Sequence, residues 1–325
     1  MAVLVTGGTG FIGSNIVGCL ARRGEDVVAF DMSPPDQATQ PLLRHFPDRV
    51  SIIRGDMRDL VLLQKLVADH SVDGVVHAAA ITPADEAWER DHCQEIVEVN
   101  LFGAVNIFQL ARSLPSLRRV IYISSDAVYG SLRPKRPVTE DHPVTLQSLY
   151  AITKYTSELM GHRWRQLFDL DIVSARLSSI YGPLERITSS RKRMSTIYSL
   201  VRLAVEGKPI KINSLQERRD YIHVWDVARG VVDLLQAPSL NHEIYNISAG
   251  KAYSVGEVLE ALAGCVPGMC YSVVAQEEAN VWVDPGRQEG PVDNNRLRTE
   301  LNFELQYPLP EGLRQYVQWV SEKNY

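Results

Sequence analysis

Short apolar runs alternate with longer amphipathic segments along the first half of the chain. Two of the intervening segments, residues 11–23 and 60–69, repeat their apolar positions at the three- and four-residue spacing of a helix. Strands that alternate with such helices form a parallel sheet covered on both faces. The pattern therefore predicts a doubly wound α/β (Rossmann) fold with six strands by residue 177. The expected strands occupy residues 2–6, 27–30, 50–54, 75–77, 120–124 and 172–175.

The alternation loosens after residue 177. A basic loop follows Pro183, a helix is expected at about 196–206, and prolines recur through the last third of the chain. We expect this part to form a smaller C-terminal α+β domain that binds the substrate. The predicted division assigns residues 1–176, with a returning segment at about 220–247, to a dinucleotide-binding domain, and residues 177–219 and 248–325 to the substrate-binding domain.

Composition narrows the class of protein. The 325 residues are 45% hydrophobic and 22% charged, with a net charge of -5, so there is no basic surplus of the kind that binds nucleic acid. No apolar run reaches about 18 residues, and a strand-like segment starts directly after Met1, so we expect neither a membrane span nor a signal peptide. These features predict a cytoplasmic enzyme.

The four cysteines lie on unrelated segments. Cys265 and Cys270 form a C-x4-C pair that lacks two further ligands at zinc-like spacing, while Cys19 and Cys93 stand alone. We therefore expect reduced core thiols and no metal site.

The first strand runs into a segment almost without side chains, TGGTGFIG at residues 6–13. Glycines between a strand and a helix allow a tight turn, and they let a pyrophosphate approach backbone N–H groups at the start of the helix. Asp31 ends the second strand, 21 residues after Gly10, where a carboxylate accepts hydrogen bonds from the adenosine ribose and repels a 2′-phosphate. The loop therefore predicts a dinucleotide site that prefers NAD to NADP.

Two later stretches, IYISSDAVYG at 121–130 and YAITKY at 150–155, carry groups for acid-base chemistry. Tyr150 and Lys154 are four residues apart and share a helix face. We expect the lysine ammonium to lower the pKa of the phenol, so that Tyr150 can act as a base. Ser125 ends the fifth strand, at the edge where α/β proteins bind ligands, and can bond the same substrate oxygen.

Together these motifs resemble the extended short-chain dehydrogenase/reductases, the NAD-dependent epimerase/dehydratase family, and in particular its UDP-glucose 4-epimerase-like members. The resemblance covers nearly the whole chain. It also rests on GDMRD at 55–59, HAAA at 77–80, Asn100, IYGP at 180–183 and RRDYIHVWDVA at 218–228.

The resemblance implies that Ser125, Tyr150 and Lys154 are catalytic. It implies a homodimer formed by the helices that carry Asn100 and Tyr150. His223 and Asp226, in YIHVWDVA, are interpreted from the residues themselves as structural, with Asp226 capping a helix. The NAD contacts that it implies are Gly7, Gly10, Phe11, Ile12, Gly13, Asp31, Asp56, Met57, Ala79, Asn100, Tyr150 and Lys154.

Three departures from the family pattern bear on the reaction. Asp126 is followed by Ala127, whereas the family's dehydratases carry Asp-Glu there, so the base for eliminating water is missing. Ser179 stands where nucleotide-sugar enzymes usually have an asparagine, and Arg287 lacks its usual neighbours. In contrast, Arg219 matches the arginine that grips the nucleotide diphosphate, and its guanidinium fork suits an anion.

The loop RITSSRKRM at 186–194 places four cations where substrate should lie: Arg186, Arg191, Lys192 and Arg193. We hypothesise that one or more of them replaces the missing asparagine and binds a phosphate or carboxylate of the substrate. The expected ligand is a small anionic sugar derivative, and its predicted contacts are Ser125, Asp126, Ser179, Arg191, Arg219 and Arg287.

Epimerisation of a nucleotide sugar through a transient ketone is the function that the resemblance favours. A net dehydrogenase of a smaller anionic sugar, sugar acid or polyol stays open, because the same catalytic residues serve both reactions. A non-catalytic NAD sensor is a more distant alternative, since such proteins often lose the tyrosine that this chain retains.

Overall fold

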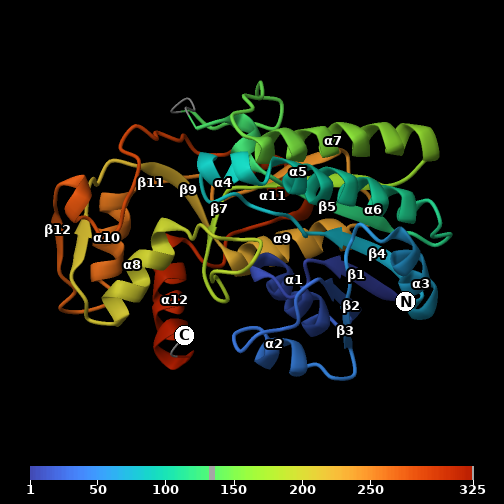
Figure 1. Ribbon diagram of the computed structural model, residues 1–325, viewed down its shortest axis with the longest axis horizontal. Coiled ribbons are helices and arrows are strands. Elements are labelled where there is room, and N and C mark those ends of the chain that lie inside the picture. The colour runs from blue at the N-terminus through green and yellow to red at the C-terminus, as the bar shows by residue number, and fades with distance from the viewer. Residues whose placement is uncertain (132–135, 324–325) are drawn as a thin grey trace.

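A seven-stranded parallel sheet forms the centre of the computed structural model, which describes residues 1–131 and 136–323 (Figure 1). The strand order is β10-β6-β5-β4-β1-β2-β3, and every neighbouring pair is parallel. The doubly wound α/β fold predicted from the alternation is confirmed. The strands are β1 (Ala2–Thr6), β2 (Asp26–Asp31), β3 (Val50–Arg54), β4 (Val72–His77), β5 (Arg119–Ser125), β6 (Ile172–Leu177) and β10 (Ile244–Ile247).

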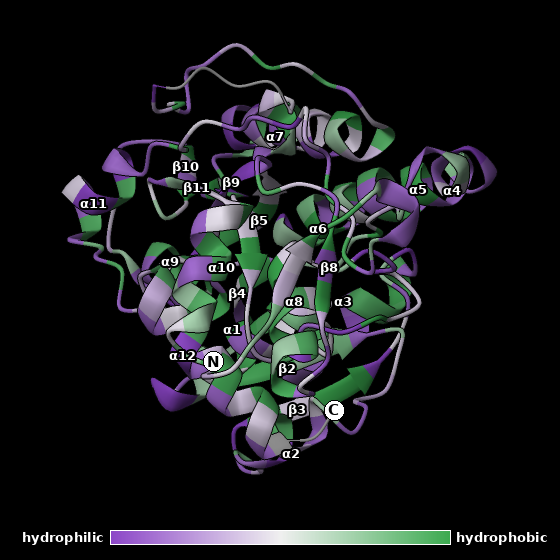
Figure 2. Cartoon of the chain, turned by 90° about the vertical axis from the view of Figure 1, so that its left-hand side faces the viewer, coloured by the Kyte–Doolittle hydropathy of each residue, from purple (hydrophilic) through white to green (hydrophobic). Residues whose placement is uncertain are grey.

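Helices cover both faces of this sheet, and apolar side chains fill the two layers between them. One layer joins the sheet to α1 (Phe11–Arg22) and α9 (Val224–Gln236). The opposite layer joins it to α3 (Leu60–His70), α6 (Gly103–Ala111) and α7 (Leu149–Phe168). Figure 2 shows the apolar strands enclosed by helices with polar outer faces. Shorter elements complete this part: α2 (Gln40–Arg44), α4 (Glu86–Asp91), α5 (Cys93–Val97), a π-helical turn η1 (Glu98–Phe102) and a 3-10 turn η2 (Asp126–Tyr129).

The connection order reverses between β1 and β4, which lie side by side although β2 and β3 separate them in sequence. The loops that leave these two strands therefore diverge to opposite faces of the sheet. Open α/β sheets bind their ligands in the crevice that such a reversal creates at the carboxyl ends of the strands.

A smaller α+β part lies beside the sheet, on the left in Figure 1. It holds a three-stranded sheet of order β11-β9-β7, a two-stranded sheet of β12 and β8, and its own apolar core. Between β9 and β11 the chain returns to the large sheet through α9 and β10, close to the predicted segment 220–247. The domain boundaries themselves stay a prediction. The elements of this part are β7 (Ser179–Tyr181), α8 (Thr196–Val205), β8 (Ile210–Ile212), β9 (Arg218–His223), β11 (Ala252–Ser254), α10 (Val255–Ala263), β12 (Tyr271–Val273), η3 (Gln276–Glu278) and α12 (Leu309–Lys323). α11 (Asn295–Leu301) packs instead against α9 and β10 of the large part.

Two structural expectations need correction. The side chain that caps α9 is His223, whose Nδ1 accepts the N–H of Trp225, whereas Asp226 accepts the N–H groups of Gln306 and Tyr307 and so ties down the C-terminal segment. The four cysteines are free thiols as expected, but Cys93 and Cys270 are exposed and are not core residues.

Two kinds of feature are absent from the described residues, 1–131 and 136–323. This part of the chain contains no helix that is both long and apolar enough to cross a membrane. It also contains no group of three or more His, Cys, Asp or Glu side chains arranged to hold a metal ion.

Candidate active site

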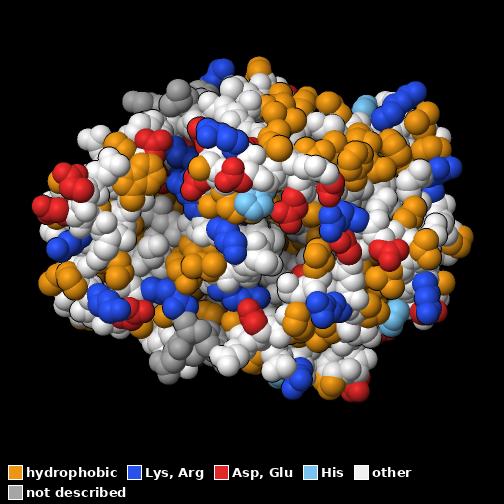
Figure 3. Space-filling view, viewed as in Figure 1, with side chains coloured by type: hydrophobic (Ala, Val, Ile, Leu, Met, Phe, Trp, Pro, Cys, Tyr) orange, Lys and Arg blue, Asp and Glu red, His pale blue; other side chains and the backbone are white. Residues whose placement is uncertain are grey.

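A cleft of about 1680 Å³ opens at the carboxyl ends of the strands, between the large sheet and the smaller part. Figure 3 shows basic side chains gathered around this hollow. Pockets for one small ligand usually measure about 300 to 1,000 Å³, so the cleft has room for a dinucleotide and a second ligand. The predicted residues that line it are Gly7, Gly10, Phe11, Ile12, Gly13, Asp31, Met57, Ala79, Ser125, Asp126, Tyr150, Lys154, Ser179, Arg191, Arg219 and Arg287.

The glycine loop forms one end of the cleft, and its packing leaves no room for side chains. Gly7 has a φ of +67°, and a Cβ there would lie 2.8 Å from the backbone nitrogen of Ala79. A Cβ on Gly13 would overlap the carbonyl oxygen of Gly7. Helix α1 starts after Gly10, which has no side chain to cap the free N–H groups of the first turn. Those N–H groups are therefore available to an anion.

Asp31 lies at the end of β2, next to this loop. Its carboxylate accepts the N–H of Thr9 at 3.1 Å and the N–H of Ser33 at 3.1 Å, so it holds the glycine loop against the strand end. The side chain still borders the cleft, as a ribose-binding carboxylate should.

Two of the predicted cofactor residues, Asp56 and Asn100, do not line the cleft, and the side chain of each bonds to other residues. Arg58 forms an ion pair with Asp56 at 2.6 Å and holds the pKa of that carboxyl below its usual range. Asn100 is buried in η1, where its side chain accepts the N–H of Ile81 at 2.8 Å and donates to the carbonyl of Ile81 at 3.0 Å. The geometry thus gives Asn100 a positioning role for the loop after β4.

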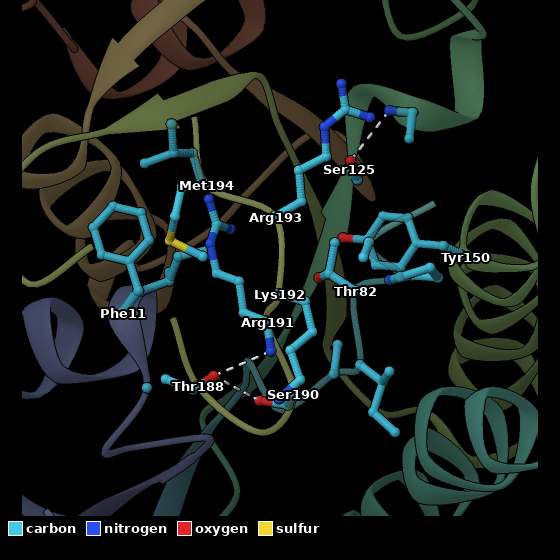
Figure 4. A pocket seen from close by; sticks show the side chains of 18 of the residues that line it. Phe11, Thr82, Ser125, Tyr150, Thr188, Ser190, Arg191, Lys192, Arg193 and Met194 are labelled. Atoms are coloured by element: carbon cyan, nitrogen blue, oxygen red, sulfur yellow. Dashed lines mark hydrogen bonds between the residues drawn. The ribbon is translucent and has the colours of Figure 1, made fainter. Parts of the chain in front are cut away.

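Tyr150, Ser125 and Thr82 meet at the middle of the cleft (Figure 4). Ser148 caps α7 by accepting the N–H of Ala151, which places Tyr150 in the first turn of the helix. Ser125 and Thr82 lie close enough to the Tyr150 phenol for hydrogen bonding to them to favour its ionised form. The motif analysis missed Thr82, although its position just after β4, at the same edge as Ser125, was a usable signal.

Lys154 lies beneath this group, almost fully buried. Its ammonium donates to the carbonyl of Ile123 at 2.7 Å and lies 5.7 Å from the centre of the Tyr150 ring. Burial lowers the pKa of Lys154 to about 7.

The expected lowering of the Tyr150 pKa by Lys154 is not what the structure shows. Burial raises the pKa of Tyr150, and the influences that oppose burial are the hydrogen bonds from Ser125 and Thr82 and the positive charge of Arg191. The physical reason is desolvation, since a phenolate loses more hydration energy than a phenol when it is buried.

Arginines and carboxylates form the other end of the cleft. The Arg219 Nε donates to the buried carboxylate of Glu217 at 2.6 Å, and Arg287 pairs in the same way with the buried Glu289. Within the described part of the chain, Arg193 forms no ion pair with a carboxylate; burial and then the charges of Arg219 and Arg287 lower its pKa. Asp284 also lines this end, and its charge and that of Glu217 act in the opposite direction on the pKa of Arg193.

The basic loop divides into two groups. Arg186 is turned toward the glycine loop and pairs with Asp36. Arg191 pairs with Glu185 at 2.9 Å, and its guanidinium lies 5.2 Å from the centre of the Phe11 ring. Lys192 and Arg193 extend into the pocket shown in Figure 4.

Residues 3–248 match the family described as the NAD dependent epimerase/dehydratase family. The chain belongs to this family. It is 29% identical to the UDP-glucose 4-epimerase of Mycolicibacterium smegmatis over the full length of both proteins. It is 27% identical to the UDP-glucuronate 4-epimerase of Thermodesulfobacterium geofontis over 98% of this chain and 96% of that protein. The UDP-glucose 4-epimerase of Thermus thermophilus, solved in complex with NAD, is 25% identical with a TM-score of 0.81 and 98% coverage of both chains.

As a member of the NAD-dependent epimerase/dehydratase family, the protein is an NAD-dependent enzyme of the extended short-chain dehydrogenase/reductase type. The cleft fits this cofactor on its own geometry. The uncapped start of α1 suits a pyrophosphate, Gly7 and Gly13 keep side chains away from it, and Asp31 stands at the expected ribose position. One half of the cleft thus has a shape that suits NAD, and the individual NAD contacts stay a prediction.

Proposed function

We propose that this enzyme epimerises a nucleotide sugar, and that the substrate is a UDP-sugar inverted at C4. The observation that carries the proposal is the continuity of one cleft. It connects a dinucleotide-binding loop, the Ser125, Thr82 and Tyr150 hydroxyls, and an arginine-rich end that suits a diphosphate. The full-length similarity to UDP-glucose and UDP-glucuronate 4-epimerases supports the same assignment.

Tyr150 is the acid-base residue of the proposed reaction. When bound, NAD supplies a reversible acceptor for the hydride of the sugar carbon. The Tyr150 oxygen takes the proton of the hydroxyl on that carbon, which leaves a ketone, and returns the proton after the sugar has turned its other face. Ser125 and Thr82 flank this oxygen and fix where the substrate hydroxyl lies.

Hydrogen bonding to Ser125 and Thr82 and the positive charge of Arg191, from the basic loop, oppose the burial that raises the Tyr150 pKa. Lys154 lies under the ring, 5.7 Å from its centre. Because the proton must return to the substrate in the second half of the reaction, the same tyrosine has to accept the proton and give it back.

The substrate diphosphate is expected at Arg219 and Arg287, with Arg193 as the additional charge. The fork of Arg219 already faces Glu217, so its affinity for an anion is moderated by that carboxylate. Arg193 is not neutralised in this way by any described carboxylate, and it fits the hypothesis that a basic-loop residue supplies the anion contact that Ser179 is too short to make. Dehydration is disfavoured because Ala127 offers no base beside Asp126.

The decisive experiment combines absorbance at 340 nm with analysis of the product. Purified enzyme is given NAD and a panel of UDP-glucose, UDP-glucuronate, UDP-N-acetylglucosamine and free sugar acids. The proposal predicts a new C4 epimer of one UDP-sugar without net NADH. Stoichiometric NADH from any of these substrates would instead identify a dehydrogenase, the alternative that the catalytic residues alone leave open.

A homodimer through α7 and the neighbouring η1 stays a proposal. Large apolar side chains are exposed on these two elements, including Phe102 at 57%, Ile152 at 41% and Leu159 at 52%. Ile152 and Leu159 are seven residues apart and share one face of α7, and Figure 3 shows apolar side chains gathered over that region. Sedimentation of the wild type against Leu159→Glu should show the dimer and its loss. The cytoplasmic location likewise stays a prediction.

A further inference from the structure

Residues 184–195, here called the strap, cross the cleft between β7 and α8 (yellow-green in Figure 1). The strap starts at Leu184, a buried non-glycine residue with a φ of +73°. Side chains rarely adopt this backbone region, and residues held there are stabilised by their surroundings. The course of the strap is therefore imposed by its contacts.

The root of the strap is a buried carboxylate. Glu185 accepts the N–H of Ser195 at 2.6 Å and its hydroxyl at 2.7 Å, and it pairs with Arg191. These bonds join the two ends and the middle of the strap. The residues of the strap are therefore tied to one another.

One anchor fastens the strap to the cofactor loop. Arg186 pairs with the carboxylate of Asp36 and donates to the carbonyl of Thr9 at 2.9 Å, within the glycine loop. Asp36 is itself held by the N–H groups of Ala38 and Thr39, both at 3.1 Å. The guanidinium is thus fixed to the wall of the cleft that holds the dinucleotide.

A second anchor fastens the strap to the opposite wall. The N–H of Thr82 donates to the carbonyl of Ser190 at 3.0 Å, and Thr82 and Arg191 form a parallel β-bridge. The loop that carries Thr82 is clamped in turn through Ile81 by Asn100. Strap residues from Ile187 to Ser195 line the cleft between these two anchors.

We propose that the strap retains the cofactor between the two half-reactions, with Arg186 as the cofactor-side anchor. The inference rests on the proposed function, because an epimerase must keep the reduced cofactor until the hydride returns, whereas a dehydrogenase releases it in every turnover. A bound dinucleotide lies under a segment tied to both walls. It leaves only when one anchor opens, so opening of the strap limits the rate of release.

The test measures release of the cofactor without any sugar. Enzyme loaded with NADH is mixed with excess NAD, and the fall of nicotinamide fluorescence gives the dissociation rate constant. Arg186→Leu removes the anchoring guanidinium. Asp36→Asn removes the negative charge that pairs with it but keeps a side-chain oxygen that can accept the N–H groups of Ala38 and Thr39. We expect each variant to release NADH roughly tenfold faster or more, because charge-assisted hydrogen bonds of this kind are lost.

The control is Arg23→Leu, which breaks a 2.7 Å pair with Asp233 on the outer surface and should leave the rate unchanged. The double variant Arg186→Leu/Asp36→Asn should release NADH about as fast as either single variant, since both remove one anchor. A correctly folded Arg186→Leu, judged by its melting temperature, with the wild-type release rate overturns the proposal. This result would leave the epimerase assignment intact. The assignment itself would be overturned by a different result, the accumulation of NADH when the wild type turns over a sugar, and that result does not affect the measured release rate.

Discussion

The two ends of the cleft are suited to anions by opposite means. At the cofactor end, glycines remove side chains so that backbone N–H groups face the ligand, and the carboxylate of Asp31 also braces the loop. At the substrate end, Arg219 and Arg287 present guanidinium groups that are already paired with buried glutamates. The first end depends on shape and the second on balanced charge, so substitutions should separate binding of the two ligands.

The largest expected effect lies between the two ends, at Tyr150. Tyr150→Phe removes the hydroxyl that carries the proton while keeping the ring. We expect kcat to fall about 10³- to 10⁴-fold, with the NAD dissociation constant changed less than about twofold. Steady-state turnover and calorimetric titration with NAD measure the two quantities. Tyr155→Phe, on the same helix but outside the cleft lining, is the control, and unaltered turnover in Tyr150→Phe would refute the mechanism.

Gly13→Ala tests the dependence of the cofactor end on shape. The added methyl group would overlap the Gly7 carbonyl, so the loop must shift. We expect a loss of roughly 1 to 3 kcal/mol of folding free energy and a large loss of NAD affinity. Thermal melting with and without NAD reports both effects. Gly264→Ala is the matched control, because Gly264 has a φ of -68° and its Cβ would meet its nearest neighbour at an ordinary 3.4 Å.

Arg219→Lys tests the dependence of the substrate end on charge geometry. Lysine keeps the positive charge opposite Glu217 but loses the two-pronged fork, so stability should be retained while the anion contact weakens. We expect KM for the nucleotide sugar to rise about tenfold with NAD affinity unchanged. Arg218→Lys provides the control, since this neighbouring arginine faces Glu257 and does not line the cleft. Equal KM values for the two variants would remove Arg219 from substrate binding.

The last expected effect is a pH dependence of stability that differs between the two ends. At the cofactor end, His77 is buried at the end of β4 and its Nδ1 bonds to the Thr6 hydroxyl at 2.6 Å. Burial lowers the pKa of His77 to about 3, from 6.5. Below pH 6.5 the unfolded chain takes up a proton that the folded chain refuses. This histidine therefore lowers stability by about 1.4 kcal/mol for each pH unit from about 6.5 toward about 3.

On β9, at the substrate end, two groups nearly cancel. Burial lowers the pKa of His223 to about 3, which also destabilises the fold as pH falls. Burial raises the pKa of Asp220 to about 7, from 3.8, so between these values the folded state binds the extra proton and gains stability as pH falls.

In His77→Asn, the slope of unfolding free energy against pH between about 6.5 and about 4 should drop by about 1.4 kcal/mol per unit. Urea titrations at several pH values measure it, and an unchanged slope would show that His77 is not buried in its neutral form.

Local pattern sufficed for most of the sheet. β1 and β3 begin and end at the predicted residues, and the glycine loop, Ser125 and the Tyr150 helix lie where their motifs indicated. These features depend on hydrophobic alternation and on backbone conformations that only particular residues allow, and both are properties of short segments. The pairing of β10 with β6 is not a local property, because the whole segment between Leu177 and Ile244 separates the two strands in sequence.

What the sequence by itself determined is therefore the parallel sheet, the glycine loop at one half of the cleft and the tyrosine proposed for acid-base chemistry. Only the tertiary structure decided which charges are neutralised. It turned Arg186 toward Asp36, paired Arg191 with Glu185, occupied Asn100 with Ile81 and brought Thr82 to Tyr150. The physical reason is that an ion pair or a pKa depends on burial and on partners distant in sequence, and no local pattern carries that information.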